Sequence, residues 1–327
     1  MNRLLRLTRR RLWTAIPVLM IVVVGGFFML EAAPGDAVDA YVGAIGGDAE
    51  LIESLRRDWG LDQSPLHRLG LYLWSLAHLD LGMSVTFSRP VRDVILERLP
   101  NTLLLMGSAT ALSFALGSLL GIVAGARPGS LRDRTLSIAS LALYAMPGFW
   151  LGLVLTVIFS VHLRWLPGSG IETIASGKTG LARALDIARH LVLPVTSLGL
   201  VYLALYLRVM RSAMAEVWRL DFVLATRARG VPRRRIVLRH VARNALLPLV
   251  TMLGVQAAAM LGGSVVVETL FSVPGLGRLA QEAVSSRDTP LLLGVILTSA
   301  VLVILVNLAV DLLYATLDPR VGTDGRT

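Results

Sequence analysis

Residues 221–248 read DFVLATRARGVPRRRIVLRHVARNALLP and lie between two strongly apolar stretches of the chain. This basic segment is rich in arginine, and Gly230-Val-Pro232 interrupts it near its centre. Glycine lets a helix end in a tight reversal and proline favours a helix start, so the pattern predicts two short helices, about 219–229 and from Pro232 through Asn244. So many charges do not lie in hydrocarbon, and the segment is therefore predicted to be a long loop between two membrane helices.

Six apolar stretches organise the rest of the chain. Each has about 20 or more residues, enough to cross roughly 30 Å of hydrocarbon as a helix, and none alternates as a strand would. Charged residues make up only 17%, and hydrophobic residues make up 54% of 327. The sequence predicts an all-α polytopic membrane protein with six transmembrane helices. The predicted spans are 12–30, 102–126, 136–161, 191–210, 245–267 and 291–314.

The distribution of charge predicts the orientation in the membrane. With the N-terminus inside, the inner segments hold 19 basic residues against five acidic ones, and the outer segments hold 12 against 16. This is the positive-inside asymmetry, so both termini are predicted to be cytoplasmic. The net charge of +10 is then mainly a topology signal and not a sign of nucleic-acid binding. The inner segments are 1–11, 127–134, 211–244 and 315–327, and the outer ones are 31–101, 162–190 and 268–290.

Residue types that carry catalysis or bind metals are scarce. The chain has no cysteine, which excludes disulfides, thiolate metal sites and cysteine nucleophiles. No HExxH or GxSxG motif is present, and the five histidines are scattered. Ser176-Gly-Lys-Thr179 resembles the end of a phosphate-binding loop, but the required first glycine is Glu172. We therefore predict no catalytic residue, no metal ligand and no cofactor in this chain.

The N-terminal region is predicted to contain a retained helix and a small external subdomain. Residues 1–33 have the layout of a signal peptide, but about 19 apolar residues exceed the usual 7–15 of a cleavable core. After this span, the pattern predicts a short helix over 48–60 and a second over 89–99, ended by Pro100. The apolar faces of these helices either pack on the membrane bundle or meet a partner that delivers a solute.

From its residues alone, the basic segment has two interpretations. In one, Phe222, Val223 and Ala225–Thr226 fill a groove on a partner protein while nearby arginines pair with acidic residues at its rim. In the other, the arginines hold the loop on anionic lipid. The residue pattern does not choose between them.

A resemblance favours the first interpretation. The basic segment resembles the loop signature of ABC-importer permeases, E-A-A-x-x-x-G, with the glycine at Gly230. Peptide-importer permeases commonly lack the glutamate and read roughly A-R-A-x-G, then R-H-x-x-R-N-A-L-L-P. This chain has Thr226-Arg-Ala-Arg-Gly230 and then Arg239-His-Val-Ala-Arg-Asn-Ala-Leu-Leu-Pro248, which departs mildly at Thr226.

Further blocks extend the resemblance almost from end to end. In their order, they identify the chain as similar to the first-named permease type of the dipeptide/oligopeptide/nickel importer family. The resemblance implies a type I ABC importer permease fold, with the N-terminal helix and external subdomain in 1–101, a core of five helices in 102–314 with its coupling loop at 211–244, and a cytoplasmic tail in 315–327. The blocks are Ala33-Pro-Gly-Asp36, Leu55-Arg-Arg-Asp-Trp-Gly-Leu-Asp-Gln63, Asp80-Leu-Gly-Met-Ser84, Arg89-Pro-Val91, Val267-Glu-Thr-Leu-Phe-Ser-Val-Pro-Gly-Leu-Gly277 and Asp311-Leu-Leu-Tyr-Ala-Thr-Leu-Asp-Pro-Arg320.

The resemblance also implies partners. Such a permease is not an enzyme; it forms half of a pore in the inner membrane of a prokaryote, with a related second permease or a second copy of itself. Two cytoplasmic ATPases that use ATP and magnesium drive it, and an extracytoplasmic solute-binding protein delivers the cargo. Peptides are the expected cargo, with nickel, glutathione or another small solute as alternatives. The residues implied in ATPase coupling are Ala225, Thr226, Arg227, Ala228, Arg229, Gly230, Arg233 and Arg234.

Polar residues within the predicted spans are candidates for the lining of the pathway. Each serine among them has an alternative role, because serine hydroxyls in helices often bond their own backbone. A competing function, an ion-coupled secondary transporter, would be expected to carry carboxylates in mid-membrane, and the spans have none there. The lining candidates are Ser108, Ser113, Gln256, Ser264 and Asn307.

Overall fold

The computed structural model describes residues 2–32, 38, 42, 49–58 and 62–317. The chain forms two compact units. The first unit contains residues 1–102 and 274–304, and the second contains residues 103–273 and 305–327. The predicted motif at 33–36 and the predicted tail beyond 317 lie outside the described residues.

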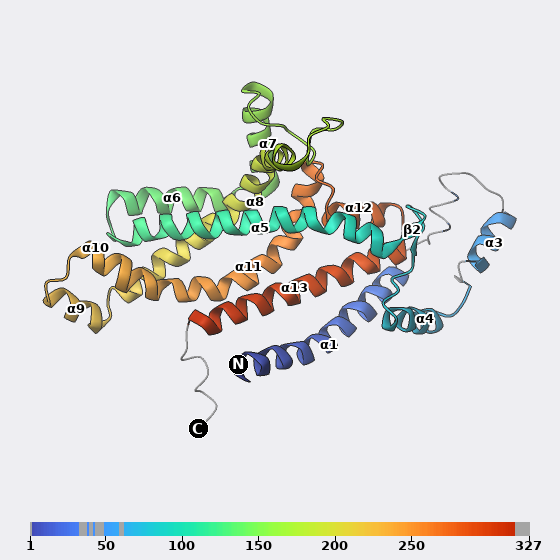
Figure 1. Ribbon diagram of the computed structural model, residues 1–327, viewed down its shortest axis with the longest axis horizontal. Helices are drawn as coiled ribbons and strands as arrows, with labels where there is room; N and C mark the ends of the chain where they lie inside the picture. Colours follow the sequence, from blue (N-terminus) through green and yellow to red (C-terminus); the bar gives the residue numbers. More distant parts are fainter. Residues whose placement is uncertain (1, 33–37, 39–41, 43–48, 59–61, 318–327) are drawn as a thin grey trace. The chain divides into compact units, whose positions relative to one another are not determined.

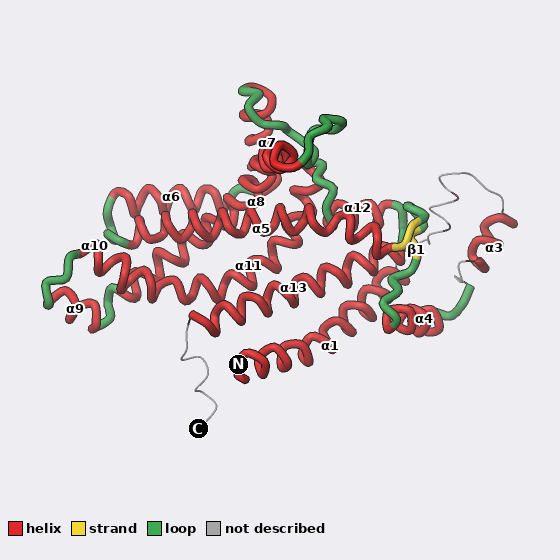
Figure 2. The backbone as a smooth tube through the Cα atoms, in the orientation of Figure 1, coloured by secondary structure: helices red, strands yellow, loops and turns green. Residues whose placement is uncertain are grey.

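Almost all of the described secondary structure is helical (Figure 1, Figure 2), which confirms the all-α prediction. Two short strands, β1 (Met83–Ser84) and β2 (Arg89–Pro90), pair antiparallel. Two π-helical turns, η1 (Val157–His162) and η2 (Ile236–Val241), also occur. The helices are α1 (Asn2–Glu31), α3 (Ala49–Asp58), α4 (Pro65–Ala77), α5 (Val91–Gly125), α6 (Leu131–Ala145), α7 (Gly148–Thr156), α8 (Gly180–Val217), α9 (Asp221–Ala228), α10 (Arg233–Arg235), α11 (Ala242–Leu270), α12 (Leu276–Ser285) and α13 (Thr289–Leu317).

Within the described residues, five helical segments are long and apolar enough to cross a membrane, and a bent helix pair makes a sixth if it is counted as one span. The span predicted over 136–161 is not one straight helix, because α6 and α7–η1 meet at an angle of 99°. Pro147 has no N–H to donate, and its ring drives Met146 out of the helical region, to φ −85° and ψ 134°. The five unbroken segments are Arg11–Glu31, Val91–Gly125, Gly180–Val217, Arg233–Leu270 and Thr289–Leu313.

Helix α5 differs from its prediction at its start. It runs through Pro100, where the predicted helix over 89–99 was expected to end. The two residues after the proline are anchored: Asn101 Nδ2 donates to Pro274 O at 2.7 Å, and Thr102 Oγ1 accepts from Leu276 N at 2.7 Å. A proline inside a helix removes one backbone hydrogen bond, whereas ending the helix here would leave several carbonyls without partners.

A buried aspartate joins α13 to the β1–β2 hairpin in the first unit. Asp288 precedes α13 and accepts from Leu291 N at 3.1 Å, which caps that helix. The same carboxylate accepts from Ser84 Oγ at 2.6 Å and from Thr86 N at 2.9 Å, which fastens the β1–β2 hairpin. The predicted helix over 48–60 is present as α3, whereas α4, which follows it, was not predicted.

Helix α8 is the central element of the second unit. Helices α6, α7 and α11 all pack against it (Figure 1). Beyond its C-terminal end the chain enters α9 and α10 and returns as α11. The basic segment is thereby placed directly at the end of the helix that organises this unit.

Candidate functional site

Gly230 ends the first short helix of the basic segment. It has φ +74°, a conformation that glycine adopts at little cost. The N–H groups of Arg229 and Gly230 donate to Ala225 O and Arg227 O, at 3.2 and 3.0 Å, and so close the last turn of α9. The prediction of a helix that ends at Gly230 is confirmed.

The second short helix differs in detail from its prediction. Pro232 is extended, with ψ 138°, and precedes α10 instead of lying in its first turn. After three residues the helix widens into the π-helical turn η2 and then continues as α11. This wider turn carries Ile236, Val237 and Val241, all of which are buried. The widening lets three apolar side chains of a strongly basic stretch reach the core together.

The basic segment has an inner and an outer face. Val223, only 3% exposed, lies in an apolar cluster with Met210 and Met214 of α8. Thr226 is also buried, and its hydroxyl donates to Phe222 O at 2.7 Å. The expectation that Val223 and Thr226 fill a partner's groove is therefore corrected: both side chains are occupied within the chain.

The outer face of α9 carries a different set of apolar residues from the predicted one. Phe222 and Ala225 are exposed, as expected. Leu224 joins them and is 71% exposed, although sequence reasoning did not select it. Its spacing puts it on the face opposite Val223 and Thr226, but the sequence does not show that those two residues face inward.

The arginines of the segment also divide into two kinds. Arg227, Arg229 and Arg234 are exposed. Arg233 is exposed as well, but it donates through Nη2 to Ala126 O at 3.0 Å, and its guanidinium lies 5.6 Å from the centre of the Trp218 ring. Arg229 also contacts its own chain, but only within its helix, since its Nε donates to Ala225 O at 3.4 Å. Arg233 is thus the predicted coupling arginine that contacts a residue far away in the sequence.

Trp218 makes a similar contact with its own chain. Its indole Nε1 donates to Gly125 O at 2.9 Å. Gly125 is the last residue of α5, and Ala126 follows it. Two donors from either side of α9 therefore meet two successive carbonyls at the C-terminal end of α5.

An ion pair between a buried aspartate and a partly exposed arginine lies beside these contacts. Asp133, near the start of α6, is 2% exposed. Two guanidinium nitrogens of Arg211 in α8, Nε and Nη2, donate to its two carboxylate oxygens. The carboxylate also accepts from Gly129 N at 2.8 Å, and Ser130 caps α6 by accepting from Asp133 N at 3.3 Å. Because the pair is bidentate and the carboxylate has further donors, its burial is compensated.

A glycine row sets the distance between α5 and α8. A Cβ atom on Gly117 would lie 2.7 Å from Tyr206 Cβ, and one on Gly121 would lie 2.5 Å from Met210 Cβ. Gly125 would place a Cβ 2.8 Å from that of Met214. The glycines of α5 and the three larger residues of α8 both repeat every four residues, so the glycine face of α5 meets a ridge of side chains on α8. This is the small-residue packing by which membrane helices approach closely.

The predicted lining residues do not form one group. Ser113 and Ser264 are buried and donate to carbonyls of their own helices, Thr110 O at 3.1 Å and Leu261 O at 2.9 Å. Their hydroxyls are thereby satisfied locally, which agrees with the alternative role stated for the serines. Gln256 is half-buried, and Asn307 Oδ1 packs against Gly254.

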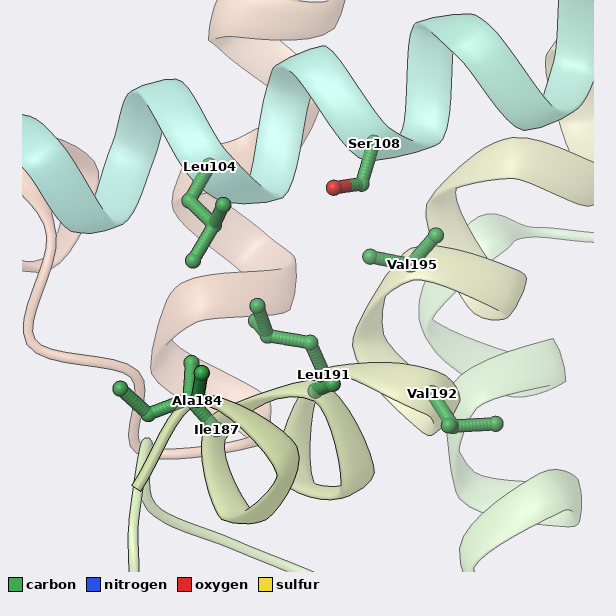
Figure 3. Close-up of a pocket in the computed structure, with 8 residues that line it drawn as sticks. Leu104, Ser108, Ala184, Ile187, Leu191, Val192 and Val195 are labelled. Carbon is green, nitrogen blue, oxygen red and sulfur yellow. The ribbon is translucent and has the colours of Figure 1, made fainter. Parts of the chain in front are cut away.

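Ser108 is the one lining candidate that borders a described pocket. The pocket has a volume of about 370 Å³ and lies between the first half of α8 and the part of α5 that precedes the glycine row (Figure 3). Its size is near the lower end for small-ligand sites. Among its lining side chains, only that of Ser108 is polar. The lining residues are Leu104, Ser108, Ala184, Ile187, Ala188, Leu191, Val192 and Val195.

Two ion pairs fasten the loop before α8 to the first turns of that helix. Asp186 accepts from Thr173 N at 2.6 Å and pairs with Lys178, so the lysine of the Ser-Gly-Lys-Thr stretch is occupied. Arg183 pairs with Glu172 at 2.6 Å, and this hydrogen bond holds the pKa of Glu172 below its ordinary value. Across the described residues, no group of three or more histidine, aspartate or glutamate side chains is placed to hold a metal ion.

Comparison with known proteins agrees with this geometry. Residues 117–323 match the family model described as binding-protein-dependent transport system inner membrane component. The di/tripeptide transport system permease protein DppB of Pseudomonas aeruginosa is 39% identical, over 95% of this chain and 97% of that protein. The dipeptide transport system permease protein DppB of Escherichia coli is 35% identical, over 97% and 99%.

A solved structure supports the fold. The inward-facing MetNI methionine ABC transporter contains a chain that superposes with a TM-score of 0.53. The match covers 69% of this chain and 96% of that chain, at 17% identity. At that identity the likeness concerns the backbone arrangement alone, and it agrees with a polytopic helical membrane protein.

Proposed function

Because this chain belongs to the family of binding-protein-dependent transport system inner membrane components, we propose that it moves short peptides across the inner membrane as a permease subunit of an ATP-driven importer. Its relatives of nearly equal length are named for di- and tripeptide or dipeptide transport, which favours peptides over nickel, glutathione or another small solute. Within this assembly the chain is a transport subunit, and ATP is hydrolysed by other subunits.

The observation that carries the proposal is the outer face of the basic segment. Exposed Phe222, Leu224 and Ala225 lie beside exposed Arg227 and Arg229 on one short helix. An apolar patch edged by cations fits a groove with an acidic rim on a soluble partner. Lipid alone would require the cations but would not require the short, rigid helix that presents them.

Coupling is proposed to work as a rigid push. Two cytoplasmic ATPases, each with ATP and magnesium, would seat the coupling residues and move them when they close on nucleotide. The permease pair would then switch between inward- and outward-open states, an equilibrium that the nucleotide biases. In this account Ala225, Arg227, Ala228, Arg229 and Arg234 face the ATPase. Gly230 sets the bend, while Thr226 and Arg233 hold the helix on its own chain.

The remaining partners are proposed on the basis of the family. An extracytoplasmic binding protein would deliver the peptide, and a related second permease or a second copy of this chain would complete the pore. Both termini would be cytoplasmic, as the positive-inside asymmetry indicates. A tag at Asp62 should then be labelled only from outside, and labelling of that tag only from inside would contradict the orientation.

The pocket beside Ser108 is the best candidate for a part of the pathway. Its walls suit apolar side chains, and the hydroxyl offers a hydrogen bond to a peptide group. Gln256 and Asn307 remain further candidates, whereas Ser113 and Ser264 bond their own helices.

Reconstitution tests the proposed function. The chain is purified with its companion subunits, placed in proteoliposomes and given binding protein with a radiolabelled dipeptide. We expect uptake that requires ATP and magnesium. Uptake that is equally fast without nucleotide, or a complete assembly that does not hydrolyse ATP, would overturn the proposal.

A further inference from the structure

We infer that Trp218 and Arg233 are positioning residues that fix the basic segment to the C-terminal end of α5, so that a push on α9 moves α5. This inference rests on the proposed function. It adds a route within the chain, which begins at the contacts with Gly125 and Ala126 and runs along α5 toward the pocket beside Ser108.

The end of α5 provides the first step. The last carbonyls of a helix have no partners within it. Here Trp218 Nε1 donates to Gly125 O at 2.9 Å and Arg233 Nη2 donates to Ala126 O at 3.0 Å. A cation at this end also interacts favourably with the helix dipole. The basic segment therefore supplies the C-terminal cap of another helix, which a loop built only to reach a partner would not need to do.

The two donors are coupled to each other. The Arg233 guanidinium lies 5.6 Å from the centre of the Trp218 ring, within the range of a cation–π interaction. Trp218 precedes α9 and Arg233 follows it, so the pair closes the segment at its base. A displacement of α9 must then carry both donors, and with them the two carbonyls of α5.

The glycine row provides the second step. Gly117, Gly121 and Gly125 leave no room for a Cβ atom against α8. Close packing of this kind transmits displacement, because neighbours cannot yield without clashing. From Gly125 to Ser108 the helix runs 17 residues, roughly 25 Å at the usual rise. A small tilt at the capped end therefore displaces the pocket end of α5.

The ion pair between Asp133 and Arg211 provides the third step. It joins the start of α6 to α8 close to the same place, with Asp133 almost fully buried. The end of α5, the start of α6, the end of α8 and the basic segment are thus fastened together by hydrogen bonds, one ion pair and close packing. We infer that they move as one body.

The test uses the complete transporter in proteoliposomes, with Trp218→Phe and Arg233→Gln. Both variants should still co-purify with the ATPases, since the outer face of α9 is unchanged. Peptide imported per ATP hydrolysed should fall roughly two- to tenfold in each, as expected for the loss of one hydrogen bond. Arg233→Lys keeps a cation, so its ratio of import to hydrolysis should lie between those of Arg233→Gln and the native chain. The double variant should be little worse than the single ones, because both changes release the same helix end.

Arg235→Gln is the matched control. Arg235 belongs to the same short helix as Arg233, is exposed, and its side chain forms no hydrogen bond within the described part of the chain. Its ratio of import to hydrolysis should equal that of the wild type. Equal ratios in Trp218→Phe, Arg233→Gln and the control would overturn the inference. Loss of ATPase co-purification in both test variants would also overturn it, because a positioning role leaves the partner surface intact.

A second readout follows α5 directly. The chain has no cysteine, so Leu104→Cys in the pocket wall introduces a single thiol. Its maleimide labelling rate should change with trapped nucleotide in the otherwise native chain. The change should be lost or at least halved with Arg233→Gln, while ATP is still hydrolysed. If the native background takes up peptide without ATP, the proposed function fails. If native uptake requires ATP, but the labelling rate at position 104 responds to nucleotide equally with and without Arg233→Gln, only the inferred route through α5 fails.

Discussion

The two loops at opposite ends of α8 treat their charges in opposite ways. Where the loop before α8 meets the start of that helix, Lys178 pairs with Asp186 and Arg183 pairs with Glu172. In the basic segment beyond α8, exposed Arg227 and Arg229 form no ion pair within the described residues. Lys178 and Arg183 therefore serve the local structure of their own loop. A loop that keeps its cations exposed on a rigid helix is built for a partner.

The same contrast separates residues inside the basic segment. Arg233 is bound to Ala126 and Trp218, whereas Arg227 is exposed and forms no ion pair within the described residues. Position in the sequence does not distinguish the two arginines, since both lie in one basic run. Only the tertiary contacts assign one to the chain and the other to the proposed partner.

The largest expected effect comes from breaking the bend of the basic segment. Gly230→Asp forces a residue with a Cβ atom into φ +74° and places an acid among the arginines. The backbone alone costs about 1–2 kcal/mol. We expect normal membrane insertion, but no peptide uptake and no co-purifying ATPase, measured on purified complexes.

Gly230→Asn is the control for charge at the same position. Asparagine has a similar size and tolerates the left-handed conformation better than most residues. It should retain part of the uptake. Robust uptake by Gly230→Asp would contradict the coupling role of this turn.

The next effect compares the two loops directly. Arg227→Glu reverses a charge on the outer face of α9, and we expect the affinity for the ATPase to fall about tenfold or more, since hydrogen bonds to charged groups contribute roughly 1.5–3 kcal/mol. Raising the salt concentration should weaken native binding and reduce the difference between variant and native. Arg183→Gln, in the paired loop, should leave ATPase affinity unchanged. Equal losses in both variants would remove the distinction between the loops.

A smaller effect is expected in the pocket. Ser108→Ala removes the only polar side chain of its lining, and the KM for a dipeptide should rise roughly two- to tenfold, the equivalent of one hydrogen bond. Ser113→Ala is the matched control, because its hydroxyl bonds Thr110 O within α5. An unchanged KM in Ser108→Ala would remove this serine from the pathway.

The smallest effect concerns pH. The hydrogen bond from Arg183 lowers the pKa of Glu172 from its ordinary 4.5, so its contribution to loop stability is full above that pH and is lost as the pH falls through the lowered pKa. Hydrogen-exchange protection of residues 163–179, corrected for the pH dependence of exchange in free peptides, should be constant from neutral pH to about 5 and fall below it. Arg183→Gln should weaken this dependence. A transition near neutral pH would contradict the assignment.

The sequence predicted the features that depend on local chemistry. Five spans followed from length and hydropathy. The turn at Gly230 followed because helices commonly end at a residue that tolerates positive φ. The inner and outer faces of α9 were only partly predicted, because helical spacing shows which residues share a face but not which face the core covers.

The features that sequence reasoning missed depend on distant partners or on competing local preferences. Arg233 is held by Ala126 and Trp218 of its own chain, and nothing in the spacing of the basic run signals this. The proline at 100 did not end a helix, whereas the proline at 147 did. At the first site Asn101 and Thr102 are anchored by hydrogen bonds; at the second, Met146 adopts an extended conformation.

The bend at Met146–Pro147 has a consequence for the surrounding lipid. Helix α6 has 15 residues and spans only about 22 Å along its axis, short of the roughly 30 Å of hydrocarbon in an ordinary bilayer. Because α7 departs at 99°, it adds little to that length. A helix this short is accommodated by local thinning of the bilayer or by flanking polar side chains that reach the interface, at a cost that grows with each ångström of mismatch. We therefore expect the transport rate of this permease to depend on the acyl-chain length of the surrounding lipid.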